Sequence, residues 1–219
     1  MENLLIWEVG SALPYVTDFL RFERQICPLP TPPKVLGFDA LHHLQYEVVG
    51  QPVQPANNTV LAQCDAVACT LDGLKKTSEM WRLFKKNVVR TPDAGNWQGG
   101  NHFNVEITIS GPKKIDLADW RLVKAVVDGF ITSLHHYKGN QLDEVSNRIK
   151  GLLGGQAMQW RELLLYGENA VLGPWRVPHL KPRGLAWSPC DHLLARCEFI
   201  QKLSRNDGWS IAGRLTSHG

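Results

Sequence analysis

The residues best suited to chemistry in this sequence are carboxylates that gather where a predicted strand passes into a predicted helix. Glu106, Asp116 and Asp119 lie within one short stretch, with a Gly-Pro turn between Glu106 and Asp116. Lys124 and a fourth carboxylate, Asp128, follow on the helix. Hard oxygen ligands of this kind bind Mg²⁺, and bound Mg²⁺ can activate water against a phosphodiester. The stretch therefore indicates metal-assisted hydrolysis, with Asp119 and Lys124 as the catalytic candidates.

The same residues also have a simpler interpretation. Aspartate is common at helix starts, where it caps free backbone N–H groups, so Asp116 or Asp119 can serve as a cap. Lys124 and Asp128 are four residues apart, the spacing of an ion pair on one helix face. A further carboxylate, Asp191, is remote in sequence and can join the set only through the fold. Spacing alone leaves both interpretations open.

A basic segment forms the second candidate surface. A helix is predicted from Thr77 or Ser78 through Val89, with an apolar stripe that ends at Val88. The cations on and around it are Lys75, Lys76, Arg82, Lys85, Lys86 and Arg90. They make either a solvated helix face or a face that contacts phosphates. The net charge of +3 neither requires nor excludes a nucleic-acid partner.

The surrounding pattern predicts an α+β fold, a mixed sheet packed against helices, in one domain over residues 1–219. The predicted helices are Leu13–Arg24, residues 77–89, residues 117–134 and Asn140–Gly155. The predicted strands are Leu44–Val49, Val60–Thr70, His102–Ser110 and Glu198–Leu203, with a last strand in the tail. Residues Trp160–Tyr166 fit either type, and four prolines between Pro28 and Pro33 exclude a helix there.

Several functional classes are disfavoured by what the sequence contains. It shows no apolar run of membrane-spanning length and no signal-peptide layout at its start, so we expect a cytoplasmic protein without a membrane partner. Five scattered cysteines argue against a disulfide framework. Cys64 and Cys69, and Cys190 and Cys197, lack the short spacing of a structural zinc site, so buried free thiols are expected. No P-loop and no G-x-S-x-G motif is present.

The order of these features resembles the RusA-type Holliday-junction resolvases. The segments that carry the resemblance are LPTPPK, the basic helix MWRLFKKNVV, the strand FNVEITISGP, the helix start DLADWRLVKAVVDGF, and AWSPCD followed by HLLARCEFIQK. The Lys-x-x-x-Asp spacing of the family is present as Lys124 and Asp128. The likeness covers roughly residues 77–135 and 185–203, separated by an insertion at about 136–184 that the compact family lacks.

The sequence also departs from the family pattern. Two residues separate Asp116 from Asp119 where the family has one, and Trp120 stands where the family has Asn. Cys190-Asp191 replaces an Asp-Asp doublet. The resemblance implies that Asp116, Asp119 and Asp191 bind magnesium and that Lys124 assists at the phosphate. It also implies a homodimer that cuts branched DNA. Glu106 is left as an outer ligand.

Three functions follow as hypotheses. The first is a magnesium-dependent, structure-selective endodeoxyribonuclease whose basic helix holds the DNA backbone. The alternative is a catalytically inactive nucleic-acid- or protein-binding module on the same scaffold, which the altered aspartate spacing favours. The third is an enzyme for a small phosphorylated or aromatic ligand, with Trp160 and Trp175 as pocket walls.

Overall fold

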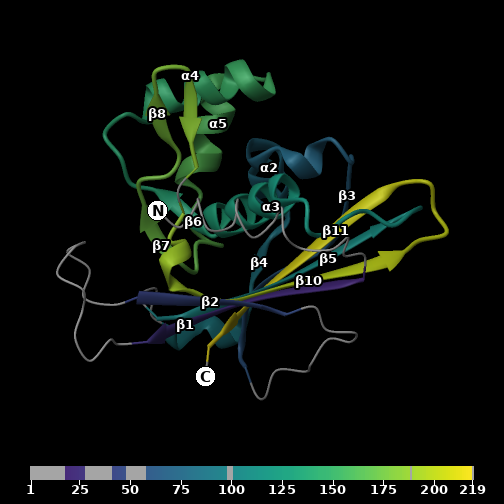
Figure 1. Cartoon of the computed structure of the whole chain (residues 1–219). Helices are drawn as coiled ribbons and strands as arrows, with labels where there is room; N and C mark the ends of the chain where they lie inside the picture. The colour runs from purple at the N-terminus through teal and green to yellow at the C-terminus, as the bar shows by residue number, and fades with distance from the viewer. Residues whose placement is uncertain (1–17, 28–40, 48–57, 98–100, 188, 219) are drawn as a thin grey trace.

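A mixed β-sheet with helices packed on it forms the body of the protein, an α+β fold (Figure 1). The computed structural model describes residues 18–27, 41–47, 58–97, 101–187 and 189–218. Within them the main sheet has the order β2-β1-β10-β5-β11-β3-β4. β5 and β10 run parallel and the other pairs antiparallel. The bounds are β1 Phe19–Cys27, β2 Leu41–Glu47, β3 Val60–Cys69, β4 Val89–Arg90, β5 Phe103–Gly111, β10 Leu194–Leu203 and β11 Trp209–Ser217.

Helices and two small sheets complete the described part of the chain. The helices are η1 Gly73–Lys75, α2 Thr77–Asn87, η2 Pro92–Asn96, α3 Trp120–Ser133, α4 Leu142–Leu153, α5 Ala157–Leu165 and η3 Asp191–Leu193. The small sheets pair β6 His135–Tyr137 with β7 Gly173–Trp175, and β8 His179–Lys181 with β9 Gly184–Ala186. None of the described helices combines the length and the apolar character needed to cross a membrane.

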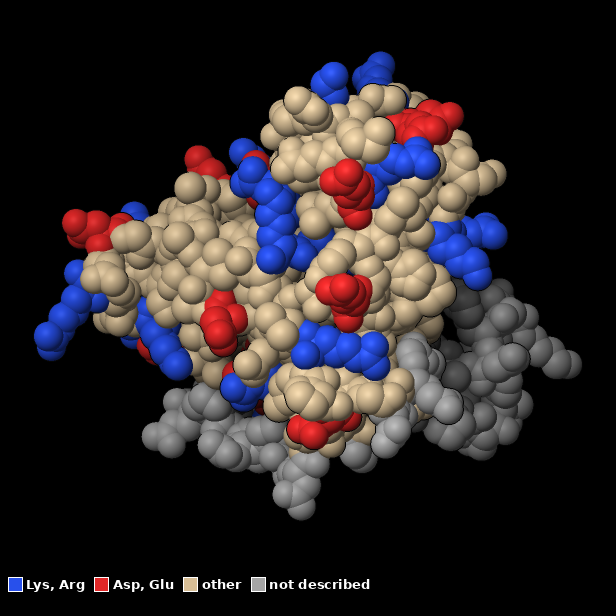
Figure 2. Space-filling view, turned by 180° about the vertical axis from the view of Figure 1, so that it is seen from behind, with Lys and Arg blue, Asp and Glu red and all other residues tan. Residues whose placement is uncertain are grey.

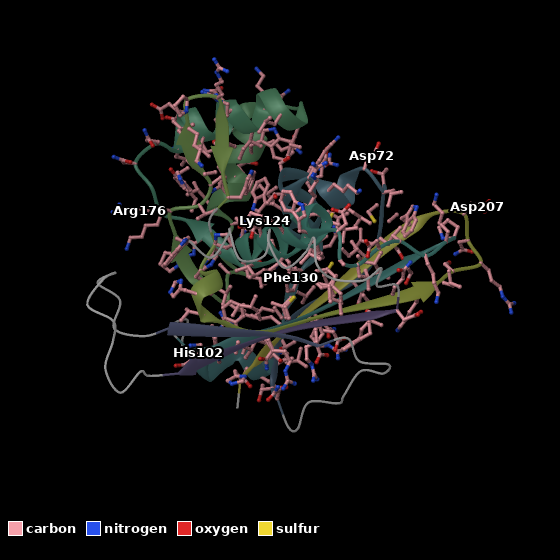
Figure 3. All side chains as sticks on the ribbon, in the orientation of Figure 1. Asp72, His102, Lys124, Phe130, Arg176 and Asp207 are labelled. Atoms are coloured by element: carbon pink, nitrogen blue, oxygen red, sulfur yellow. The ribbon has the colours of Figure 1, made fainter. Side chains whose placement is uncertain are left out.

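Strand β5 and helix α3 form the centre of the core, as their patterns predict. Alternate residues of β5 are buried beneath α3, among them Ile107 and Ile109, while Glu106 points to the other face of the sheet. Phe130 projects from α3 toward the sheet (Figure 3). Gly213 of β11 makes room for it, because a Cβ there would lie 2.6 Å from the ring of Phe130.

The predicted insertion at residues 136–184 contributes helices α4 and α5 and much of the two small sheets. These elements share a second apolar cluster, which is centred on Trp81 of α2. Trp81 contacts the rings of Trp160 and Trp187 at centroid distances of 6.3 Å and 5.4 Å. The elements thus form a lobe on the outer side of α2, away from the sheet (Figure 1). The predicted single domain with an insertion stays a prediction.

Two predicted elements differ from the structure. The predicted helix Leu13–Arg24 is wrong for the part of it that the structure describes, because residues 19–27 form strand β1. Leu20 packs in the core while Arg21 pairs with Glu198 on the opposite face, and this alternation is what a strand requires. Residues 1–17 and the proline-rich segment 28–33 lie outside the described residues.

The second difference concerns the end of the chain. The last strand predicted in the tail is confirmed as β11, which lies between β5 and β3, so Glu198–Leu203, a part of the ten-residue β10, does not close the sheet. The ambiguous segment Trp160–Tyr166 is helical and belongs to α5.

Candidate functional site

The two aspartates at the start of α3 act as helix-start residues. Asp119 is the N-cap, and its Oδ1 accepts a hydrogen bond from the Arg121 N–H at 3.1 Å. Oδ1 of Asp116 accepts from the Ala118 N–H at 2.9 Å. The second oxygen of Asp119 accepts from Nζ of Lys75 at 2.7 Å. Both oxygens of Asp119 are therefore engaged by protein donors.

The electrostatics of Asp119 fit this arrangement. Partial burial by itself would raise the pKa of Asp119, but the hydrogen bond and charge of Lys75 lower it more, with help from the backbone N–H groups of Arg121 and Leu122. The net pKa lies below the ordinary value, so the carboxylate is ionised at neutral pH. A metal ion that bound there would have to displace Lys75.

Lys124 is occupied by the partner that its spacing predicts. Its Nζ lies 2.9 Å from Oδ2 of Asp128, one turn further along α3. The Asp128 side chain is only 7% exposed, whereas that of Lys124 is 33% exposed. The pair anchors Lys124 along the helix.

Asp191 lies at the other end of α3 from Asp119. It begins η3, which leads into β10, and the first residue of β10 pairs with Phe103 at the start of β5. The neighbouring Cys190 contacts His135, just beyond the C-terminus of α3. A helix of 14 residues spans about 20 Å. The side chain of Asp191 is outside the described set, but its position in the chain separates it from Asp116 and Asp119.

The structure thus brings Asp116 and Asp119 together at the start of α3 without Glu106, and the magnesium site stays a prediction. Glu106 lies on the opposite face of the sheet from α3, and Asp191 lies near the far end of that helix. Among the side chains that the structure describes, no group of three or more His, Cys, Asp or Glu residues is placed to hold a metal ion.

The predicted phosphate-contacting cations are largely engaged within the protein. Lys75 binds Asp119, Arg82 pairs with Glu79, and Lys86 lies 5.9 Å from the ring centroid of Trp160. Arg90 donates to the Ala94 carbonyl. Lys76 is exposed.

Lys85 is the clear correction in this basic set, because it is a core residue. It is 1% exposed, and its Nζ donates to the carbonyls of His135 at 2.6 Å and Tyr166 at 2.9 Å. Tyr166 is the C-cap of α5, and His135 directly follows the C-cap of α3, so both carbonyls lie close to helix C-termini, where the helix dipole favours a cation. Burial lowers the pKa of Lys85 to about 8. Buried in this way, Lys85 cannot contact DNA.

A cysteine–histidine contact next to Lys85 is a feature that the sequence did not reveal. Nδ1 of His135 lies 3.1 Å from the Gly173 carbonyl, which can only accept, so Nδ1 carries the proton. Nε2 then accepts from the thiol of Cys190 at 3.0 Å. The pKa of His135 is lowered to about 4, mainly by burial and also by the charges of Lys85 and His136, against the opposing effect of the Gly173 carbonyl.

This contact has the partners of a nucleophile–base pair but not the access. Cys190 is 1% exposed and His135 is 3% exposed, so a substrate cannot reach either reacting atom. The Trp175 ring stacks on His135 with centroids 5.7 Å apart. The contact therefore holds η3 against the end of α3. The adjacent histidines of residues 135–136 were visible in sequence, but the pairing with Cys190 depends on the fold.

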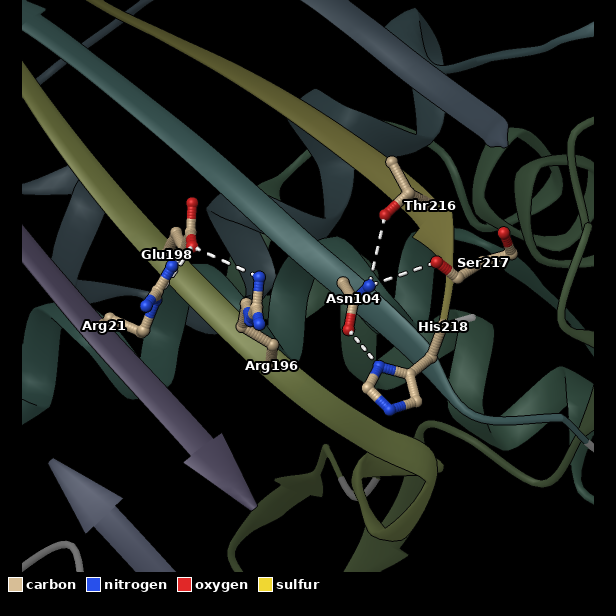
Figure 4. Close-up of polar contacts among 7 residues, drawn as sticks. All are labelled: Arg21, Asn104, Arg196, Glu198, Thr216, Ser217 and His218. Atoms are coloured by element: carbon tan, nitrogen blue, oxygen red, sulfur yellow. Dashed lines mark hydrogen bonds and ion pairs between the residues drawn. The ribbon is translucent and has the colours of Figure 1, made fainter. Parts of the chain in front are cut away.

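A row of charges crosses the face of the sheet opposite α3. Each of four adjacent strands contributes one charged residue, which pairs in register with the charged residue on the next strand. The row runs from Arg21 of β1 through Glu198 of β10 and Glu106 of β5 to Arg214 of β11. Nε and Nη2 of Arg21 donate to Oε1 of Glu198 at 2.9 Å and 2.8 Å (Figure 4). Nη1 of Arg214 lies 3.9 Å from Oε1 of Glu106. The two adjacent glutamates are thus flanked by arginines, which offset their mutual repulsion.

A shallow hollow of about 210 Å³ lies beside this row, over β3, β11 and β5. Its charged lining comes from two acids, Asp65 and Glu106, and two cations, Lys202 and Arg214. The charges balance, so the hollow does not select for either a cation or an anion.

The four cysteines whose side chains the structure describes carry free thiols. Cys64, Cys190 and Cys197 are buried, as expected, while Cys69 is half-buried. Burial raises the pKa of Cys64 and of Cys69 to about 11, so neither thiol is activated. Comparisons with protein-family models, with curated proteins and with solved structures found no match.

Proposed function

We propose that this chain is a non-catalytic protein-binding module that associates with a second copy of itself through the free edge of strand β3. The observation that carries the proposal is the difference in length between β3 and its outer neighbour, β4. β3 has ten residues, yet β4 pairs only with Ala62 and Gln63. In the described ranges, no strand lies beside residues 64–69 on that side.

An unpaired strand edge is a template for another strand. It presents backbone N–H and C=O groups that gain hydrogen bonds when an extended segment pairs with them. Native edges are commonly protected by lysine, proline or several charges. Residues 64–69 contain one charge, Asp65, and no proline. Ala66 and Ala68 are exposed and small, so they allow a second backbone to approach.

A second copy is the occupant that this edge suits. Antiparallel pairing of β3 with β3 of another copy obeys two-fold symmetry, so one surface serves both partners. The two sheets would then join into one continuous sheet. Because Asp65 is the one charge between residues 64 and 69, staggered pairing can avoid placing like charges opposite each other.

The start of α3 supports a binding role over metal-dependent cleavage. Asp119 caps α3 and binds Lys75, and Asp191 lies near the opposite end of the helix. A magnesium-dependent nuclease for branched DNA would need these carboxylates at one ion. The charge distribution on one face of the molecule also favours a protein over a nucleic acid. On the face shown in Figure 2, lysine and arginine side chains are interspersed with aspartate and glutamate rather than gathered into one basic patch.

The test measures association as a function of concentration. Sedimentation velocity of the full chain should show a monomer–dimer equilibrium. The double variant Ala66→Glu, Ala68→Glu places like charges across the paired edges and should raise the dimer dissociation constant by at least about tenfold. The matched control, Asn147→Glu with Gln159→Glu, adds the same charge at exposed positions of α4 and α5 and should associate like the wild type.

Two results would contradict the proposal. A protein that is monomeric at every concentration reached would remove the second copy as partner, and equal weakening in both double variants would assign association to net charge. Cleavage of branched or linear DNA that requires Mg²⁺ and is lost in the Asp116→Asn, Asp119→Asn variant would restore the nuclease hypothesis.

A further inference from the structure

A second pocket lies in the lobe, far from both the start of α3 and the edge of β3, and its lining charge has one sign. It has a volume of about 550 Å³ and lies at the end of the small sheet that β6 and β7 form. Its lining residues are Tyr137, Lys138, Gly139, Asn140 and Arg176. Two of them are cations and none is a carboxylate.

The parallel pairing of β6 and β7 brings the two cations together. Tyr137 stands opposite Trp175, and the Lys138 N–H donates to the Trp175 carbonyl at 2.8 Å. Lys138 directly follows β6 and Arg176 directly follows β7, so the two residues leave the small sheet side by side. Neighbouring strands are about 4.8 Å apart, so the two like-charged side chains start from adjacent backbone positions and repel each other. An anion between the two side chains would turn this repulsion into attraction.

The loop after β6, which lines the pocket, packs closely against the Tyr137 side chain. It turns so tightly over Tyr137 that a Cβ on Gly139 would lie 2.2 Å from the tyrosine hydroxyl oxygen. The Gln141 N–H donates to the same hydroxyl oxygen. Burial and the charge of Glu144 raise the pKa of Tyr137, so the hydroxyl stays neutral and adds no negative charge. The loop thereby places Lys138 and Asn140 at the rim.

We propose that this pocket binds the phosphate dianion of a phosphate monoester. The Arg176 guanidinium can donate two parallel hydrogen bonds to phosphate oxygens, and the Lys138 ammonium supplies a second charge. The Asn140 amide can donate to the remaining oxygen. Arg176 lies at the outer side of the lobe, well apart from Lys124 in the middle of α3 (Figure 3), so this site is separate from the carboxylates there.

The experiment titrates the full chain with inorganic phosphate and with phenyl phosphate, and follows backbone amide shifts by NMR. We expect shifts at Lys138, Gly139 and Arg176. The variant Lys138→Gln, Arg176→Gln should weaken binding by at least about tenfold. Both side chains are exposed, so the variant should keep the wild-type spectrum elsewhere. Tighter binding of phenyl phosphate than of inorganic phosphate would support a monoester as the ligand, and equal or weaker binding would contradict it.

A matched control distinguishes phosphate binding in this pocket from a general attraction of anions to basic side chains. Lys181→Gln, Arg183→Gln removes the same charge from exposed positions of the hairpin β8–β9 in the same lobe, outside the pocket lining. It should bind both probes like the wild type. Equal losses in the two double variants, or wild-type binding by the Lys138→Gln, Arg176→Gln variant, would overturn the proposal.

Discussion

The two ends of helix α3 show how the same helix dipole is used at the surface and in the core. At the N-terminus, the anion Asp119 caps the helix and pairs with Lys75, whose side chain is 45% exposed. At the C-terminus, the cation Lys85 binds the His135 carbonyl and is 1% exposed. Each charge has the sign that its helix end favours. Water screens the first arrangement but not the second, so their energetic consequences should differ widely.

The largest effect is expected at the buried end. Lys85→Ala removes the donor to two carbonyls near helix C-termini and leaves a cavity, so we expect a loss of about 3–5 kcal/mol in the free energy of unfolding. Urea denaturation followed by circular dichroism measures it. Lys86→Ala, next in the chain and exposed, should cost no more than about 1 kcal/mol through its contact with Trp160. Similar losses of unfolding free energy in the two variants would show that the burial of Lys85 does not make its contribution to stability larger than that of Lys86.

Protonation of His135 should give the next largest effect. Its pKa is about 4 in the folded protein and 6.5 when unperturbed, so between these values the unfolded chain binds more protons. The stability contribution of His135 is therefore complete above pH 6.5 and declines as the pH falls toward 4, by at most about 3 kcal/mol.

The measurement is urea denaturation at a series of pH values from 7 to 4, for the wild type and for His135→Gln. The variant should lose this part of the pH dependence, while the contributions of other groups remain. An unchanged slope in His135→Gln would show that another group is responsible.

The two ends of α3 also show which contacts could be predicted from the sequence and which could not. Cap and ion-pair chemistry is local, so the Asp119 cap and the Lys124–Asp128 pair follow from spacing and are confirmed. The α+β class and strands such as β3 follow from periodicity and are confirmed.

Long-range contacts are a different matter, because they depend on which elements the fold brings together. The lysine at position 85 looks like its exposed neighbour at 86, and only the packing of α3 and α5 around α2 shows that it is buried. The same holds for the contact of Cys190 with His135, 55 positions apart. The expected union of Asp191 with Asp119 depends on the fold in the same way, since order along the chain does not fix the end of α3 at which η3 lies.

A smaller effect is expected at the exposed end of α3. Asp119→Ala removes the side-chain cap and should cost about 1–2 kcal/mol, whereas Asp119→Asn keeps an acceptor and should cost a few tenths. Thermal denaturation compares the two variants. MgCl₂ should raise the melting temperature no more in the wild type than in Asp119→Asn. A magnesium-dependent rise that only the wild type shows would mean that the carboxylate binds the ion despite Lys75.

The smallest effect isolates the ion pair from the cap. Nζ of Lys75 and Oδ2 of Asp119 lie 2.7 Å apart, but both side chains are partly exposed. Solvent screening therefore limits the coupling energy of the pair to about 0.2–1 kcal/mol. A double-mutant cycle of Lys75→Ala and Asp119→Ala measures that energy, and it should shrink further at high salt. Coupling of several kcal/mol that resists salt would mean that the start of α3 is as shielded from water as its end. The contrast between the two ends would then have to come from something other than burial.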